Sequence, residues 1–148
     1  MVNRYSIIIL LGATLLFAAC SKSGGGQVSD GSGGLLGHDN GVVDTTAPVL
    51  LIYTPTLNQV FNSGNTISVT GNISDDLGLY QGSVRITNDA NGAILKEQLY
   101  EIHYVLNYDF SVNYVPTVSS PADYTVTVSF MDHGYNTATK SVKIHVNP

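Results

Sequence analysis

The sequence predicts an all-β protein, and three observations support that prediction. Apolar and polar residues alternate over 122–131 and 141–146, which gives each segment one buried and one solvated face. Turn-forming Gly, Pro, Asn and Asp residues interrupt the chain at intervals of roughly 8–12 residues. No segment shows the apolar periodicity of a helix.

The expected strands begin near Thr45. Pro48 and Pro55 bracket the first of them, because proline is tolerated at strand starts and edges. A turn at 62–65 and a loop at 75–78 precede and follow the second strand. We expect about seven strands in all: 49–53, 66–74 and 79–87, two from the segment 93–114, and two from the segment 122–146.

The segment 93–114 is too long to be a single straight strand of a small sandwich. Its even positions are apolar or aromatic without interruption from Tyr100 to Tyr114. These fifteen residues, fully extended, would span ~50 Å. We therefore expect a break in the strand between Glu101 and Leu106.

Two hairpin turns are expected, at 88–92 and at 132–136. In the second, Gly134 and Asn136 are residue types that accept the positive φ of a hairpin turn. About seven strands at this spacing are typical of an immunoglobulin-like antiparallel β-sandwich. Tyr124, at the start of the sixth strand, is then either the tyrosine corner of that fold or a core aromatic residue.

The first 19 residues are typical of a secretory signal peptide. Arg4 is the short basic start, and an apolar run up to Ala19 follows it. As a helix that run would rise only ~20 Å, short of the ~30 Å hydrocarbon core of a bilayer. Residues 20–44 are rich in Gly and Ser and have no periodicity, which predicts a flexible tether ahead of a domain at 45–148.

The end of the signal segment resembles the lipobox of bacterial lipoproteins. The matching residues are Leu16-Phe17-Ala18-Ala19-Cys20, with Phe17 where that motif usually has Leu. The resemblance implies cleavage before Cys20 and a lipid on its sulfur, hence an outer membrane lipoprotein, at the periplasmic face or the cell surface. The alternative is an ordinary signal peptide with an incidental cysteine. Cys20 is the only cysteine, so the chain can form no internal disulfide.

The remainder of the chain resembles bacterial immunoglobulin-like modules. The resemblance is carried by Asp44-Thr45-Thr46-Ala47-Pro48, by the loop at 75–78, by 123–128 and by the hairpin turn at 132–136. Many such modules open with D-x-x-A-P. The chain also resembles the small immunoglobulin-like lipoproteins of Bacteroidetes. These motifs are turn chemistry, so they imply a fold rather than an activity.

The net charge argues against nucleic acid as a partner. Without the signal peptide the chain would carry five basic and eleven acidic residues, a net charge of −6. No basic patch is present to neutralise phosphates.

Several oxygen-bearing side chains are expected at one end of the sandwich, where the first strand begins and two loops meet. Carboxylate and amide oxygens in that number could hold Ca²⁺, although no other cofactor is expected. The alternative is that these residues are turn formers that bond their own backbones. The candidate ligands are Asp44, Asp75, Asp76, Asp132 and Asn136.

Two tyrosines, Tyr80 and Tyr135, are expected at the same end, and tyrosine is favoured in binding loops. No G-x-S-x-G motif or pair of carboxylates across a cleft is recognisable, so we do not expect an enzyme. We expect a non-catalytic, lipid-anchored module that binds a protein or glycan at the cell envelope. The alternative is a structural spacer or accessory subunit of a larger surface complex.

Overall fold

A computed structural model describes residues 43–148. The signal peptide at 1–19, Cys20 and the tether up to residue 42 lie outside the described residues. The described part consists of strands, turns and loops, and holds no helix. No helix long and apolar enough to cross a membrane occurs in it.

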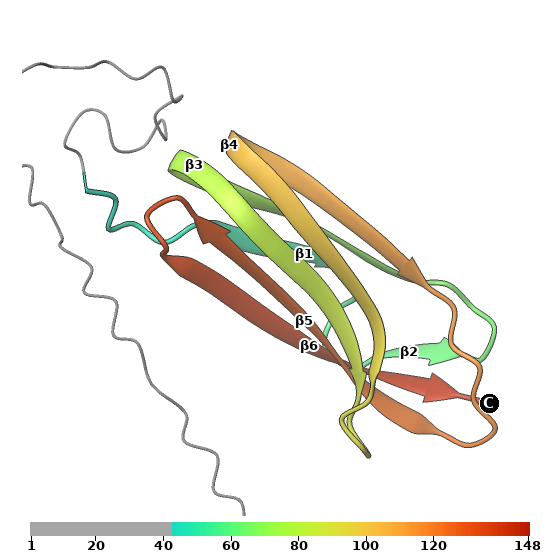
Figure 1. Cartoon of the computed structure of the whole chain (residues 1–148). Helices are drawn as coiled ribbons and strands as arrows, with labels where there is room; N and C mark the ends of the chain where they lie inside the picture. Colours follow the sequence, from blue (N-terminus) through green and yellow to red (C-terminus); the bar gives the residue numbers. More distant parts are fainter. Residues whose placement is uncertain (1–42) are drawn as a thin grey trace, which may run out of the picture. The chain divides into compact units, whose positions relative to one another are not determined.

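Six strands make up this part of the chain (Figure 1). They are β1 (Val49–Thr54), β2 (Gln59–Asn62), β3 (Ile67–Asn88), β4 (Ile94–Tyr114), β5 (Ala122–Asp132) and β6 (Thr137–Asn147).

The two longest strands, β3 and β4, are antiparallel neighbours and take part in both layers of the fold. Up to Ser74, β3 pairs on its other side with β1, whereas from Leu79 onward it pairs with β5. The second layer continues from β5 to β6 and then to β2, which is the only strand of the described part that runs parallel to its neighbour. The predicted immunoglobulin-like β-sandwich is therefore confirmed.

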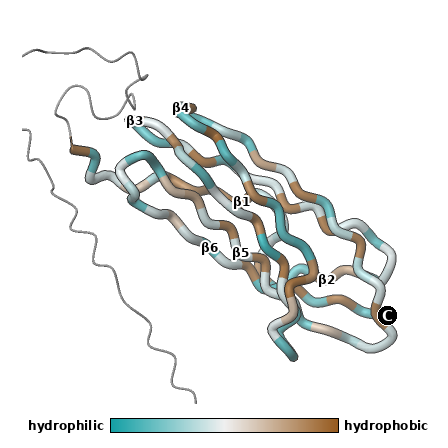
Figure 2. The backbone as a smooth tube through the Cα atoms, viewed as in Figure 1, coloured by the Kyte–Doolittle hydropathy of each residue, from teal (hydrophilic) through white to brown (hydrophobic). Residues whose placement is uncertain are grey.

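The expected alternation decides which side chains fill the core. On β5, Tyr124, Val126, Val128 and Phe130 are all buried, whereas the intervening residues are partly exposed. Figure 2 shows the corresponding bands of apolar and polar residues along the strands. Tyr124 packs in the core cluster, and burial together with Tyr114 raises the pKa of its hydroxyl. The buried apolar residues are Leu50, Ile67, Val69, Ile73, Leu79, Val84, Ile86, Ile102, Phe110, Val112, Tyr124, Val126, Val128, Phe130, Ile144 and Val146.

Two expected interruptions are bends inside continuous strands. The loop expected at 75–78 is an irregular stretch within β3, where the register shifts between Ser74 and Leu79. The break expected between Glu101 and Leu106 is a bulge within β4, centred on Tyr104 with φ of 64°. The prediction of separate strands was wrong here, because a bulge lets one strand turn from one layer to the other without ending.

One strand, β2, was not predicted. It has only four residues, with two polar side chains at its ends, so it shows too short an alternation to be recognised. The hairpin turn at 88–92 is confirmed: the amide of Gly92 donates to the carbonyl of Asn88 at 2.8 Å, and Gly92 has φ of 69°.

Candidate functional site

Three segments distant in sequence meet at one end of the sandwich. They are the residues just before β1, the bend in β3, and the β5–β6 loop. The side-chain amide of Asn136 donates to the carbonyl of Asp44 at 3.2 Å, and the amide of His133 donates to the carbonyl of Gly78 at 3.1 Å. Residues expected at the same end are thus held together by hydrogen bonds between loops.

Three of the five candidate calcium ligands form a cluster. One carboxylate oxygen from each of Asp44, Asp75 and Asp76 lies within 4.8 Å of the others. A hollow of about 340 Å³, also lined by Thr46 and Ser74, opens beside Asp75 and Asp76. We call Asp44, Asp75 and Asp76 the acid cluster.

The acid cluster contains buried oxygens that accept no hydrogen bond. Oδ2 of Asp75 accepts from the amides of Leu77 at 3.0 Å and Gly78 at 2.7 Å, and Oδ1 of Asp44 accepts from the amide of Thr46 at 3.0 Å. The other oxygen of each, Oδ1 of Asp75 and Oδ2 of Asp44, is buried without a hydrogen-bond partner in the described part of the chain.

This environment raises the pKa of Asp75. Burial is the main cause, because it disfavours the charged form. The hydrogen bonds from Gly78 and Leu77 lower the pKa, and the negative charges of Asp44 and Asp132 raise it further. Asp75 is therefore a carboxylate whose charge is incompletely compensated.

The other two candidate ligands bond to each other. Asp132 is fully buried, and its two carboxylate oxygens accept from the amide of Asn136 at 2.9 Å and from its side chain at 3.1 Å. These bonds close the β5–β6 loop, as expected of turn-forming residues.

The oxygens of the acid cluster suit a hard cation. Ca²⁺ and Mg²⁺ take carboxylate and carbonyl oxygens, whereas zinc favours histidine and cysteine. The two buried oxygens of Asp44 and Asp75 and the exposed carboxylate of Asp76 are such donors.

Beside the acid cluster lies a group of five rings. Tyr80 comes from β3, His103 and Tyr104 from β4, and His133 and Tyr135 from the β5–β6 loop. We call these residues the ring cluster. Tyr80 lies at its centre, with ring centroids 4.9 Å from His103, 4.9 Å from His133 and 6.4 Å from Tyr135.

The two predicted binding tyrosines are thus brought together, and three further residues were missed. The histidines looked scattered in sequence, yet the ring centroids of His103 and His133 are only 5.5 Å apart. The expected break in 101–106 and the expected loop at 75–78 both interrupt the sandwich at this end. Pairing the two would have placed His103 and Tyr104 beside Tyr80.

Two rings of the cluster stand on left-handed backbone. Tyr104 has φ of 64° and Tyr135 has φ of 65°. This conformation is a rare one for a bulky residue. The expectation that Gly134 and Asn136 supply the positive φ of this loop was wrong. Gly134 is needed for space, since a Cβ there would lie 2.7 Å from Cβ of Asp44.

Apolar surface is exposed around the ring cluster. Tyr135 is 71% exposed, Tyr104 38% and Leu77 39%, and Val105 and Leu106 next to Tyr104 are also exposed. A groove of about 340 Å³ starts beside the cluster, with Gln81, Leu99, Glu101, Met131 and Thr137 among its lining residues.

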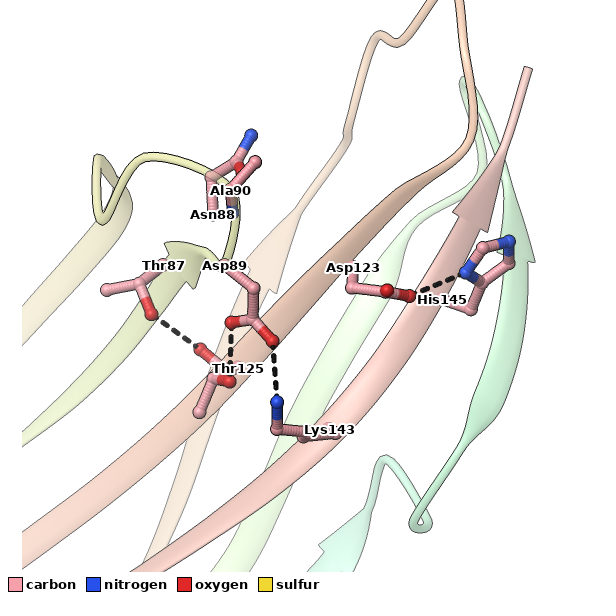
Figure 3. Close-up of polar contacts among 8 residues, drawn as sticks. All are labelled: Thr87, Asn88, Asp89, Ala90, Asp123, Thr125, Lys143 and His145. Atoms are coloured by element: carbon pink, nitrogen blue, oxygen red, sulfur yellow. Dashed lines mark hydrogen bonds and ion pairs between the residues drawn. The ribbon is translucent and has the colours of Figure 1, made fainter.

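The basic residues of the described part lie away from this end. Lys143 pairs with Asp89 at 3.0 Å, and Asp89 also accepts from the hydroxyl of Thr125 at 2.6 Å (Figure 3). Both contacts lower the pKa of Asp89, Thr125 first. Arg85 pairs with Glu97, with Nε 3.0 Å from the carboxylate. Positive charge is compensated at the far half of the second layer, whereas the acid cluster has no such partner among the described residues.

Comparison with known proteins found likeness only among solved structures. No family model matches the chain, and no curated protein matches it. A similar structure is the CARDB domain of the PF1109 protein from Pyrococcus furiosus, described as a complex with di-metal ions. It is 15% identical, its TM-score is 0.38, and the match covers 69% of this chain and 93% of that one.

Proposed function

We propose that this chain is a non-catalytic binding module of the cell envelope that contacts its partner through the ring cluster. The observation that supports this most is the left-handed backbone of Tyr104 and Tyr135. Each such residue costs on the order of 1–2 kcal/mol relative to ordinary backbone. The sandwich core does not need either ring, because both are exposed while the core is filled by other side chains. Backbone strain of this kind tends to occur at functional sites.

The arrangement of the rings also suits binding. Tyrosine offers a large contact area with few rotatable bonds, so little entropy is lost when it is covered. The rings come from two strands and one closed loop, so they are positioned before a partner arrives. Exposed apolar surface beside polar and acidic residues is a common property of interaction sites.

We further propose that a lipid on Cys20 anchors the module to the outer membrane. The lipobox-like sequence at 16–20 and the absence of any other cysteine in the chain support this part of the proposal. A Gly/Ser-rich tether of this length would let the domain reach ~25–30 Å from the bilayer surface.

For the acid cluster we propose a Ca²⁺ site. Two buried carboxylate oxygens without hydrogen-bond partners support it, since a divalent cation would compensate both. Such an ion would tie the segment before β1 to the bend of β3, and would thereby fix the loop end next to the ring cluster.

Photo-crosslinking in cells tests the binding proposal. A photo-reactive residue replaces Leu77, beside the ring cluster, or Leu57, in the β1–β2 connection. We expect a discrete adduct only from position 77, and loss of that adduct when Tyr135→Asn is added. Tyr53→Ser, which removes an exposed tyrosine of β1, should leave it intact. An adduct that forms equally from both positions, or that survives Tyr135→Asn, would contradict the proposal.

A second candidate function, a structural subunit of a larger complex, has one observation in its favour. Val49, Leu51 and Tyr53 alternate along β1 and are 60%, 46% and 56% exposed, so they form an apolar strip on an edge strand. Light scattering of the full chain tests this candidate. It predicts an oligomer that Leu51→Ser dissociates and Leu57→Ser does not, whereas a monomer at high concentration excludes self-assembly through this strip.

A further inference from the structure

We propose that the ring cluster and the acids around it bind a cationic segment of a partner protein, one that carries lysine or arginine side chains in an extended conformation. This inference rests on the proposed function and names the chemical class of its ligand. Charge, ring geometry and the shape of the adjoining groove support it independently.

The charge of this end is negative and uncompensated by basic side chains. The acid cluster, the buried Asp132 and Glu101 in the groove wall are all acidic. The described part has four basic residues, and two of them pair with acids elsewhere. The other two, Lys96 and Lys140, lie opposite Ile86 and Val128 in the middle of the second layer. Such a concentration of one charge attracts a ligand of the opposite sign.

The rings reinforce that preference. An aromatic face attracts a lysine or arginine cation within ~6 Å of its centre, and a neighbouring carboxylate adds to the attraction. Tyr135 is the most exposed ring of the cluster. Tyr104 has one face covered by the parallel ring of His133, and Tyr80 meets its neighbours at steep angles. Few rings therefore offer the broad open face on which a neutral sugar would stack.

The groove gives the rest of the segment a place to lie. Two of its lining residues, Gln81 and Glu101, are within two positions of ring-cluster residues in sequence, so the groove starts beside the rings. Leu99 and Met131 line it with apolar surface, against which the aliphatic stem of a lysine or arginine packs while its charge reaches Glu101. A single ligand could thus contact the rings and the groove at once.

Fluorescence polarisation with labelled hexa-arginine, hexa-glutamate and a neutral Gly/Ser peptide tests the inference on the full chain. We expect hexa-arginine to bind and the other two peptides to bind at least about tenfold more weakly. Asp75→Asn with Asp76→Asn should weaken hexa-arginine by about five- to tenfold. Tyr135→Asn should weaken it by about two- to fivefold, as expected for one exposed cation–π contact.

Matched variants separate a site from general electrostatics. Glu97→Gln with Asp123→Asn removes the same charge from the far half of the sandwich and should change affinity by less than about twofold. Tyr53→Ser should have no effect. Asp76→Asn alone serves as the second variant if the double variant unfolds, because Asp76 is exposed.

Three outcomes would overturn the inference. Equal loss from the near and far acid variants would mean that affinity follows net charge. Binding of a neutral N-acetylated trisaccharide that depends on Tyr135, without binding of hexa-arginine, would make the ligand a glycan. A crosslinked adduct at position 77 without hexa-arginine binding would leave the binding function intact and show that its ligand is not cationic.

Discussion

The phenol ring of Tyr104 stacks on the imidazole ring of His133, with ring centroids 4.4 Å apart and planes 8° from parallel. Tyr104 stands on the bulge of β4, and His133 is a nearly buried residue of the β5–β6 loop. The stack therefore joins the bend of an edge strand to a loop that comes much later in the chain. A binding surface fixed in this way loses little entropy when a partner covers it.

Replacement of Tyr135 should separate stability from binding. Tyr135→Asn keeps a residue type that tolerates left-handed backbone, and it removes an exposed ring. We expect the free energy of unfolding to stay the same or to rise by up to ~1 kcal/mol, while partner binding falls. Urea denaturation measures the first quantity. A loss of stability well above ~1 kcal/mol would show that the ring is part of the structural core instead.

The raised pKa of Asp75 predicts how stability depends on pH. The native state keeps the Asp75 proton to a higher pH than the unfolded chain, whose value is near 3.8. The contribution of Asp75 to stability therefore falls as pH rises from the unfolded pKa through the raised folded pKa. Asp75→Asn should remove this fall and make the chain more stable at pH 7, as measured by urea denaturation between pH 3 and pH 7.

Asp89 gives a comparison of opposite sign for that experiment. Its pKa is lowered by Thr125 and Lys143, so its contribution is present above the unfolded pKa and is lost as pH falls through the folded pKa. Asp89→Asn should therefore lower stability at pH 7. Equal effects of Asp75→Asn and Asp89→Asn at pH 7 would contradict the assignment of both.

Calcium should raise the melting temperature if the acid cluster binds it. At a hundred times Kd the ion would stabilise the native state by ~2.7 kcal/mol, or several degrees for a domain of this size. Millimolar CaCl₂ is compared with MgCl₂ and with NaCl at matched ionic strength. Asp76→Asn should abolish a calcium-specific rise, and Asp109→Asn should not. Identical shifts in all three salts would reduce the effect to screening of a negatively charged protein.

The alternation on β5 predicts unequal costs for neighbouring substitutions. Val128 is fully buried, so Val128→Ala should lower the free energy of unfolding by roughly 1–3 kcal/mol. Thr127 points to the other face, where its hydroxyl lies 3.0 Å from that of Ser141. Thr127→Ala should cost well below the Val128 value in the same denaturation series. A larger loss at Thr127 would be inconsistent with this register.

Lipid anchoring is tested by one substitution outside the described residues. Cys20→Ser should move the protein from the membrane fraction to the soluble fraction, because no sulfur remains to carry the lipid. Metabolic labelling with a radioactive fatty acid provides the measurement. Failure of the unsubstituted protein to incorporate that label would rule out the lipoprotein assignment.

The fold class followed from the sequence because burial in a sandwich imposes a local pattern. Val126 and Val128 alternate with threonines, and each choice of face depends on the strand repeat of two residues. The turn at 88–92 was equally local, since Gly92 marks its positive φ. The binding tyrosines Tyr80 and Tyr135 were placed at one end by the same strand-and-turn reasoning.

The ring cluster as a whole was decided by the tertiary structure. The sequence does not show that β3 and β4 continue through their bends, because a bulge depends on how two layers pack and leaves no periodic signal. Those bends bring His103 and Tyr104 from β4 against Tyr80 from β3, and the β5–β6 loop then adds His133 and Tyr135. Neither do residue types reveal left-handed backbone at a tyrosine, since local preference favours glycine or asparagine there. Only long-range contacts can hold a bulky residue in that conformation.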